Sequence, residues 1–567
     1  MNESLAYKTE KRIYEFLPHR PQSMAATLFI IGMTLYYLWR MFAITPQYDE
    51  LYTYYTFISR GPLYAAIHWP LPNNHVGYSV LSALLDMTGN SYIGLRGVSY
   101  ICAVANLILV YKICLRYYSH ALPFAAMLLY SCMQVVNDYS VQGRGYTLAA
   151  TCFLVSIYLA GRICSIEETN LWYYRILSVC FILGLYTVPS SIYWVLTMSF
   201  AIASCLLING YKSRGMRPKL SDNAYVRKFN QFFVHGLIAA VITTILYGLI
   251  WFAIGSNLLV KNAESAFFGM SHAEVLLRSP VSCLRTGIDY MLSQPYIQSL
   301  SPEDFRMQCL SWCDNLFNYM IPGVTGIISF SLILALIIAL YECIMHFSYS
   351  RTVINIIIVC NIVITGAMLL IQQKLPYLRV FGYSAFIVTI CICTCLERII
   401  NTAVRMYNYE IRHKKGDTEH ERAAHKEFET ALRSEAWYSG MGVYIPAATI
   451  IVLFIIRVAG SSLHAQLAER ETELFSILYI ANVPSRSNIA ALDCDQQYLL
   501  KFGWDIDCEK TDVTDADCVI IDKNMTIPGY AGADFWKFYQ TYETIDWEYI
   551  DTMRVSYENE NFILYTK

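Results

Sequence analysis

Two adjacent carboxylates, Asp49 and Glu50, stand just past the first strongly apolar segment of the chain, in the run Pro46-Gln47-Tyr48-Asp49-Glu50-Leu51-Tyr52. A carboxylate at such a position can accept a proton from a hydroxyl group and act as a general base. Acidic residues also favour the first turn of a helix, where they interact with the helix dipole. The pair is therefore either a catalytic base or the ordinary start of a helix.

The chain continues with aromatic, amide and imidazole groups on either side of two prolines, in the stretch His68-Trp69-Pro70-Leu71-Pro72-Asn73-Asn74-His75-Val76-Gly77-Tyr78. The prolines fix the local backbone, and Asn and His side chains offer hydrogen bonds to a sugar or a phosphate. An aromatic belt at headgroup depth explains Trp69, but it explains the amides and the imidazole less well. Asn73, Asn74 and His75 are therefore candidate binding residues.

Cations stand in two further short segments near apolar runs. Arg144 lies in Asn137-Asp138-Tyr139-Ser140-Val141-Gln142-Gly143-Arg144-Gly145-Tyr146, and Lys374 and Arg379 lie in Gln372-Gln373-Lys374-Leu375-Pro376-Tyr377-Leu378-Arg379. An arginine at a membrane surface can extend to lipid phosphates, or it can hold a carboxylate or a phosphate through its planar fork. Two such turns suggest a shared anionic ligand.

The elements that must position these residues are membrane helices. Of the 567 residues, 56% are hydrophobic and only 15% are charged, whereas a soluble domain carries about a quarter charged residues. About 20 apolar residues cross the hydrocarbon layer, and the chain has about eleven such segments. We expect them near residues 25–44, 97–114, 121–137, 145–161, 174–189, 191–209, 232–254, 322–345, 353–371, 380–396 and 441–458.

The positive-inside rule predicts the orientation. A cytoplasmic N-terminus (1–22) places the basic loops, such as Lys112 with Arg116, inside. The membrane module (23–459) then has outer loops at 45–92 and 255–321, and the candidate site lies on the extracytoplasmic face. Residues 460–567 are predicted to form a small α/β extracytoplasmic domain, with strand-like runs at Cys518-Val519-Ile520-Ile521-Asp522 and Asn561-Phe562-Ile563-Leu564-Tyr565.

Taken in this order, the motifs resemble the membrane glycosyltransferases of the GT-C class, in particular the family with the protein O-mannosyltransferases and the lipid A aminoarabinose transferase. The resemblance covers the hydrophobic core and is strongest from Met41 to Leu148. That family has an Asp-Glu pair or a single Asp in its first outer loop and a Pro-rich stretch with His or Lys further along. An Arg in a Gly-Leu-Arg-like segment and a turn similar to Gln-x-Arg-x-Tyr follow. The matching positions are Asp49 and Glu50, Trp69 to Tyr78, Gly94-Leu95-Arg96, and Gln142 to Tyr146.

The resemblance implies a GT-C fold and an inverting transfer of a sugar from a polyprenyl-phosphate donor to an acceptor hydroxyl. Asp49 would be the base, and His75, Lys374 and Arg379 would contact the donor phosphate. Arg96 and Arg144 would support the outer loops or the carboxylates, and Tyr146 completes the last motif. The implied partners are a polyprenyl-phosphate-linked sugar, the lipid bilayer, and a glycan, lipid or protein acceptor.

Other interpretations stay open. A polytopic transporter or flippase for a lipid-linked or anionic substrate has the same hydropathy, and so has a non-catalytic sensor or assembly subunit. Asp49, Glu50 and His75 have suitable atoms for a divalent cation, but their spacing fixes no geometry. The net charge of −2 gives no sign of a nucleic-acid partner, which a basic stripe in the sequence would normally indicate. Cysteines in the segments expected outside can form disulfides there: Cys283, Cys309, Cys313, Cys494, Cys508 and Cys518.

Overall fold

The computed structural model describes most of the chain, as helices followed by a small sheet. It covers residues 21–68, 74–119, 121–165, 170–213, 223–293, 300–345, 351–415, 469–484, 487–491, 494–506, 513–528 and 545–567, together with the single positions 452 and 456. The side chains of 403–415 and of a few other positions are outside this description. Of the candidate site residues, Asn73 falls outside it.

Eight helices of the described chain are long and apolar enough to cross a membrane. The chain is therefore a multi-pass membrane protein. The eight are α2 (Pro21–Ala43), α6 (Ser91–Tyr117), α9 (Tyr146–Ile163), α11 (Ile192–Ser213), α12 (Ala224–Lys261), α16 (Thr325–Met345), α17 (Thr352–Gln372) and α18 (Ser384–Lys415).

Two further predicted spans correspond to apolar helices that are shorter than the eight long ones. The segment 121–137 gives α7 (Leu122–Ser131) and then a separate short helix, α8 (Gln134–Tyr139), and the segment 174–189 gives α10 (Leu171–Thr187). Hydropathy alone does not register the break at Cys132 and Met133 between α7 and α8, because both residues are apolar. The predicted span 441–458 lies outside the described residues apart from positions 452 and 456.

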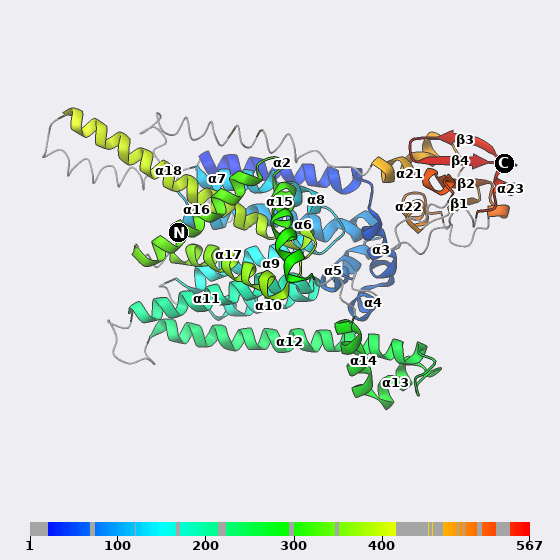
Figure 1. Cartoon of the computed structure of the whole chain (residues 1–567), viewed down its shortest axis with the longest axis horizontal. Helices are drawn as coiled ribbons and strands as arrows, with labels where there is room; N and C mark the ends of the chain where they lie inside the picture. The colour runs from blue at the N-terminus through cyan, green and yellow to red at the C-terminus, as the bar shows by residue number, and fades with distance from the viewer. Residues whose placement is uncertain are drawn as a thin grey trace, which may run out of the picture.

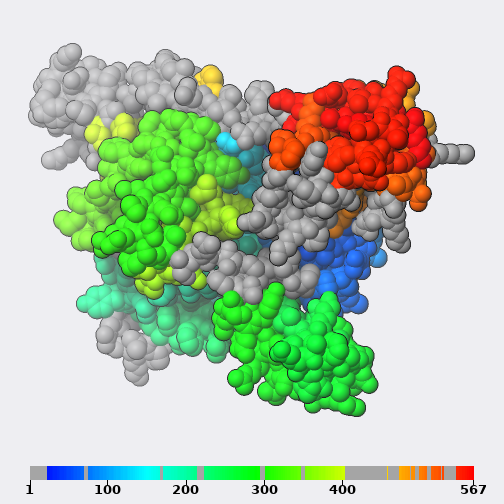
Figure 2. Space-filling model, turned by 45° about the vertical axis from the view of Figure 1, so that its right-hand side comes forward, coloured from blue at the N-terminus to red at the C-terminus, as the bar shows by residue number. Residues whose placement is uncertain are grey.

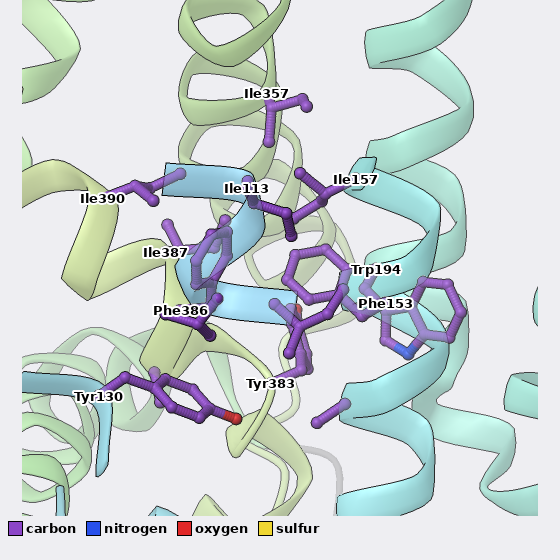
Figure 3. Packing of buried hydrophobic residues seen from close by; sticks show 14 of the residues in the cluster. Ile113, Tyr130, Phe153, Ile157, Trp194, Ile357, Tyr383, Phe386, Ile387 and Ile390 are labelled. Atoms are coloured by element: carbon purple, nitrogen blue, oxygen red, sulfur yellow. The ribbon is translucent and has the colours of Figure 1, made fainter. Parts of the chain in front are cut away.

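The interior of the helical bundle is a continuous apolar core. Its side chains come from helices far apart in sequence, and Figure 3 shows how they interlock. Phe153 of α9 packs edge-on against Tyr383 at 5.1 Å and near Trp194 of α11 at 5.8 Å between ring centroids. The close packing of such large rings fixes the helices relative to one another.

One end of the bundle carries short helices that lie between the long ones in sequence. The first group follows α2, and the second follows α12, which continues into the predicted outer loop 255–321 (Figure 1). These helices are α3 (Tyr48–Thr56), α4 (Pro62–Ile67), α5 (Val76–Asp86), α13 (His272–Arg278), α14 (Pro280–Ser293) and α15 (Pro302–Met320), with the 3₁₀ turns η1 (Ile58–Arg60), η2 (Pro189–Ser191) and η5 (Leu378–Phe381).

Helix α14 lies against α12 at two glycines. A Cβ at Gly255 would meet the Cys283 carbonyl oxygen at 1.7 Å, and a Cβ at Gly287 would meet the Trp251 carbonyl oxygen at 2.1 Å. Larger residues would force the two backbones apart. The structured part of this loop is therefore fastened to the end of a membrane helix.

The C-terminal region is a small α/β unit, as predicted. Its four-stranded sheet has the order β1-β2-β4-β3, in which β1 runs parallel to β2 while β4 is antiparallel to both β2 and β3. The predicted strands correspond to β2 and β4. The elements are α21 (Glu469–Ile480), β1 (Ile489–Ala491), α22 (Cys494–Trp504), η6 (Val513–Asp515), β2 (Cys518–Asp522), η7 (Lys523–Thr526), α23 (Trp547–Ile550), β3 (Arg554–Glu558) and β4 (Phe562–Thr566).

The segments predicted to lie outside come together in the structure. Helix α22 packs on α3, and α15 packs on α8 and on η5. The sheet lies beyond α3 at the same end of the bundle (Figure 1), and in Figure 2 the C-terminal unit borders the blue region of α3 to α5 while α13 and α14 project on another side. Segments spread over the whole sequence thus meet around α3.

Candidate active site

Helix α3 presents the two carboxylates to different surroundings. Its start is fixed by a capping box, in which the Gln47 backbone N–H donates to Glu50 Oε2 at 3.0 Å. Successive residues of a helix are rotated by about 100°. Asp49 and Glu50 therefore point in different directions although they are adjacent in sequence.

The Glu50 carboxylate is buried and completely bonded, with 1% of its side chain exposed. The Nε and Nη2 atoms of Arg96 donate to its two oxygens at 2.9 Å each, and the Gly143 backbone N–H donates to Oε1 at 2.6 Å. With the Gln47 N–H, each oxygen accepts two hydrogen bonds. Such a carboxylate has no remaining site for a proton from a substrate.

Arg96 is equally buried and ties three segments together. Its Nη1 donates to the backbone carbonyls of Met41 at 3.1 Å and Ile44 at 2.6 Å, at the end of the first membrane helix. Its fork therefore joins the end of α2 to α3 through Glu50. These contacts fit both roles that the resemblance implied for Arg96, support of a carboxylate and support of the loop after α2.

The Asp49 carboxylate, in contrast, is one-third exposed and faces two arginines. Its Oδ2 lies 3.2 Å from Arg379 Nη1 and 3.9 Å from Arg144 Nη2. Arg144 is buried, and its Nη1 donates to Thr53 Oγ1 at 2.9 Å and to the Asp49 backbone carbonyl at 3.3 Å. Residues that stand 95 and 330 positions away in sequence thus converge on this carboxylate.

The turn that carries Arg144 fits closely because of its glycines. A Cβ at Gly143 would meet the Leu95 side chain at 2.5 Å, and one at Gly145 would meet the Thr187 methyl group at 2.3 Å. The small residues let the backbone approach α6 closely enough for Gly143 N–H to reach Glu50. The spacing Gln-Gly-Arg-Gly-Tyr therefore has a packing reason as well as a chemical one.

His75 is buried beside Arg144. Its Nδ1 accepts a hydrogen bond from the Gly145 N–H at 2.8 Å, and its ring meets Tyr146 edge-on at 4.8 Å. Burial, together with the charges of Arg144 and Arg379, lowers the pKa of His75 well below its ordinary value. The imidazole is therefore neutral, and it adds no positive charge for a phosphate.

Asn74 is used inside the loop. Its amide nitrogen donates to the carbonyls of Ala65 at 3.0 Å and His68 at 2.9 Å, and its oxygen accepts from Ser79 Oγ at 2.7 Å. This side chain holds the ends of α4 and α5 in register. These contacts are structural, and ligand binding by Asn74 stays a prediction.

Lys374 and Arg379 lie in the turn after α17. Trp312 of α15 donates its indole N–H to the Pro376 carbonyl at 2.7 Å, which fixes this turn, and Arg379 stacks over Tyr377 at 5.0 Å. Arg379 Nε is buried without an acceptor in the described part of the chain. The turn thus presents Arg379 to Asp49, whereas no hydrogen bond or ion pair of Lys374 is recorded among the described residues.

The C-terminal unit holds α3 from the other side. Tyr498 of α22 stacks on Tyr55 with the ring centroids 5.4 Å apart, and Phe502 meets Tyr54 edge-on at 5.5 Å. Leu51 is completely buried in the same apolar cluster as the interior of the C-terminal unit. We call these contacts of Tyr498 and Phe502 with α3 the aromatic clasp.

A cation site built from Asp49, Glu50 and His75 does not fit this arrangement. All four acceptor positions of Glu50 are taken, and His75 Nδ1 accepts a backbone N–H. In the described part of the chain, no group of three His, Cys, Asp or Glu side chains has a geometry suited to a metal ion. Cys283, Cys309, Cys313 and Cys518 are free thiols, and Cys494 and Cys508 lie outside the described side chains.

Sequence reasoning missed two charged residues near the site, Arg40 at the end of α2 and Asp138 in α8. Both line a cavity next to Glu50, together with Tyr319 of α15. The available signal was a charge at the end of an apolar segment, where burial requires a partner. From the sequence, Arg40 was placed near the outer end of the first membrane span and was given no role in the site.

The fold and the site define a class: a multi-pass helical membrane protein with an Asp carboxylate facing two arginines at one end of its bundle. No family model and no curated protein sequence matches the chain. Among solved structures it is similar to the oligosaccharyltransferase AglB from Archaeoglobus fulgidus, solved with an inhibitory peptide and a dolichol-phosphate. The TM-score is 0.43 and the identity 10%, over 89% of this chain and 70% of that chain.

A second solved structure is the arabinosyltransferase EmbB from Mycobacterium smegmatis. Here the TM-score is 0.25 and the identity 12%, over 62% of this chain and 40% of that chain. Neither similarity is high enough to assign an activity to this protein.

Proposed function

We propose that this chain is a GT-C membrane glycosyltransferase that transfers a sugar from a polyprenyl-phosphate donor to an acceptor hydroxyl at the outer membrane face. The observation that carries the proposal is the contact of the partly exposed Asp49 carboxylate with Arg379 and Arg144. This arrangement combines a proton acceptor with positive charge for a departing phosphate. The resemblance of the sequence motifs supports the same function.

In the proposed reaction Asp49 removes the proton of the acceptor hydroxyl as its oxygen attacks the anomeric carbon of the sugar. The bond from that carbon to the phosphate oxygen breaks, and the polyprenyl phosphate leaves with the electron pair. Arg379 exchanges Asp49 for the phosphate, and Lys374 and the buried Nε of Arg379 supply further donors. Fixed charges aimed at a developing anion are often the largest catalytic contribution.

The proposed transfer inverts the configuration at the anomeric carbon, and the state of Glu50 supports this part of the proposal. A retaining transfer needs a nucleophile in addition to an acid or base. The neighbouring carboxylate, Glu50, has its oxygens fully bonded to Arg96 and to backbone N–H groups, so Glu50 is not available as that nucleophile. With Asp49 as the base, a single direct displacement inverts the anomeric configuration, as the resemblance implies.

Glu50, Arg96, His75 and Asn74 are positioning residues in this proposal. Glu50 and Arg96 fix the end of α2 against α3. His75 holds the Arg144 turn through Gly145. Tyr146 packs against His75 and keeps that ring in place.

The test is a membrane transfer assay with the Asp49→Asn protein and a panel of dolichyl- and undecaprenyl-phosphate hexoses and pentoses. Loss of a general base lowers turnover by about 10²–10⁴-fold, and the variant should keep the abundance and melting temperature of the wild type. Mass spectrometry of glycans and lipid-linked sugars in cells, with and without the substitution, identifies the sugar and the acceptor.

Asp289→Asn is the matched control, because Asp289 is an exposed carboxylate that pairs with Arg285 on the surface of α14. It should transfer sugar at the wild-type rate. Full transfer by Asp49→Asn would refute the assignment of the base. A transporter or a sensor is the better interpretation if no donor of the panel is consumed and Asp49→Asn leaves the cellular glycans unchanged.

A further inference from the structure

A polar cavity of about 130 Å³ lies on the Glu50 side of α3, between the end of α2, helix α8 and helix α15. Glu50 lines this cavity, whereas Asp49 does not. The volume is much larger than the space that a single ordered water requires. The cavity therefore has room for a ligand of several heavy atoms, and nothing in the proposed reaction has yet used it.

The walls of the cavity carry polar groups with spare hydrogen-bonding capacity. Arg40 is almost fully buried, and its Nη1 reaches Asn137 Oδ1 at 3.5 Å, while its Nε has no acceptor in the described part of the chain. Gln142 donates to Gln47 Oε1 at 2.6 Å, but its own Oε1 is buried and has no donor among the described residues. Such unsatisfied buried atoms are costly unless a ligand or water completes them.

Asp138 lines this cavity together with Arg40. Tyr319 and Gln134 lie close to its carboxylate, which has acceptor positions for further donors. Burial raises the pKa of Asp138, while the nearby Arg40 charge opposes that shift. Tyr139 and Tyr319 add aromatic surface to the lining.

The charge balance of the cavity differs from that of the Asp49 side. Arg96 is neutralised by Glu50, and Arg40 is opposed by Asp138, so the formal charges of the lining cancel. Around Asp49, two arginines face one carboxylate. A phosphate is favoured on the Asp49 side, and a neutral ligand with many hydroxyl groups is favoured in the cavity.

We propose that this cavity binds one neutral sugar ring, with Asp138 and Gln142 Oε1 accepting from its hydroxyls and Arg40 Nε donating to one. The proposal rests on the proposed function, because it assigns the ring to a substrate of that transfer. The ring belongs either to the donor or to a glycan acceptor. Both sources share the chemistry, and the experiment separates them.

The first measurement is binding of a panel of methyl hexosides and pentosides to the purified full-length protein in detergent, by saturation-transfer NMR. It uses the Asp49→Asn background, so that binding is seen without turnover. Asp138→Asn and Gln142→Leu should each weaken binding by at least tenfold. Arg379→Gln should leave it unchanged, because that residue lies on the Asp49 side.

The second measurement is the kinetics of sugar transfer by two variants that keep Asp49, namely Asp138→Asn and Gln142→Leu, compared with the wild type. A rise of about tenfold in KM at little change in kcat is expected for one substrate only. A raised KM for the polyprenyl-phosphate sugar assigns the ring to the donor, and a raised KM for the acceptor assigns it to the acceptor. Gln142→Leu keeps the test decisive if Asp138→Asn fails to fold.

The proposal would be overturned if no glycoside binds to the protein with the unaltered cavity. It would also be overturned if both variants have the same glycoside binding and the same KM values as the protein with the unaltered cavity. The outcome is distinguishable from failure of the proposed function. Glycoside binding that depends on Asp138, combined with full activity of Asp49→Asn, would leave the sugar site standing and remove Asp49 as the base.

Discussion

The two sides of helix α3 treat neighbouring carboxylates in opposite ways. On one side Glu50 is buried in a neutral, fully bonded pair with Arg96, and on the other Asp49 is partly exposed between two arginines. A buried charge is tolerated only when it is completely compensated. A group that is to exchange protons with a substrate must keep an accessible oxygen. The difference in burial therefore suits Glu50 to a structural role and Asp49 to a chemical one.

The largest difference between the two sides of α3 is expected when the buried charge of Glu50 is removed. Glu50→Ala leaves Arg96 unpaired in the interior and should destabilise the protein by about 3–5 kcal/mol. Asp49→Asn removes only a partly exposed ion pair and should cost less than about 1 kcal/mol. The melting temperatures of both variants in detergent measure this contrast.

The double variant Glu50→Gln with Arg96→Met tests the cause, because it removes both buried charges together. It should recover a large part of the lost melting temperature. Equal melting temperatures for Glu50→Ala and Asp49→Asn would show that the two sides of α3 do not differ as described.

The next largest effect is expected for Arg379, the cation nearest Asp49 Oδ2. Arg379→Gln should lower kcat by about 10²–10³-fold, as loss of one fixed donor at a developing anion does. Its melting temperature should barely change, because the pair with Asp49 is more than one-third exposed on the arginine side. Transfer assays at saturating donor measure the rate.

Arg285→Gln on the exposed surface of α14 is the matched control and should leave kcat unchanged. A loss of activity in both arginine variants would indicate a general electrostatic effect, not a contact with the departing phosphate.

His75 gives a smaller, pH-dependent effect. Its pKa is lowered by burial and by Arg144 and Arg379, so the unfolded chain binds the proton near pH 6.5 while the folded protein does not. Stability is therefore full above about pH 6.5 and falls as the pH decreases, by at most about 1.4 kcal/mol per unit.

Melting temperatures between pH 7.5 and 5.5 measure this slope. His75→Gln should show a flatter decline below pH 6.5 than the wild type. The same slope in both proteins would mean that His75 is protonated in the folded state.

The smallest effect is expected at the aromatic clasp. Tyr498→Ala removes stacking on Tyr55, which contributes about 0.5–1.5 kcal/mol beyond its area. Because α3 carries Asp49, the variant should lower kcat several-fold while KM stays near the wild-type value. Steady-state kinetics measure both constants.

Tyr549→Ala is the control for the clasp, because Tyr549 lies in the C-terminal unit and donates to the Thr514 carbonyl, away from α3. It should leave kcat unchanged. A matching fall in both variants would point to loss of the C-terminal unit as a whole, not to loosening of α3.

Much of the architecture was predictable from the sequence. Hydropathy located the eight long apolar helices, since long apolar segments have few alternatives in a bilayer, although α6, α12 and α18 extend beyond the predicted ends. Strand-like apolar runs located β2 and β4. Hydropathy did not resolve the division between α7 and α8, and it gave no sign of helix α5, because these depend on contacts with neighbouring helices. The predicted orientation and the domain limits at 23–459 and 460–567 stay predictions.

The site was predicted in part. Asp49 was chosen as one of two adjacent carboxylates, Arg144 and Arg379 were chosen as exceptions to the charge pattern, and the structure brings the three together. Substrate binding by His75 and Asn74 stays a prediction, while the contacts that the structure shows for both side chains are to other parts of the protein. The sequence does not show which side chains are buried, so these contacts could not be predicted from it.

By itself the sequence determined that the chain spans a membrane many times and carries acidic and basic residues in the segments between helices. Only the tertiary structure decided which carboxylate is available, because Glu50 and Asp49 are the same kind of group one position apart. The choice depends on Arg96, Gly143 and the Arg379 turn, which come from three distant segments. Partners from distant parts of the sequence determine the environment of each carboxylate, and that environment makes Glu50 a structural residue and leaves Asp49 available as a base.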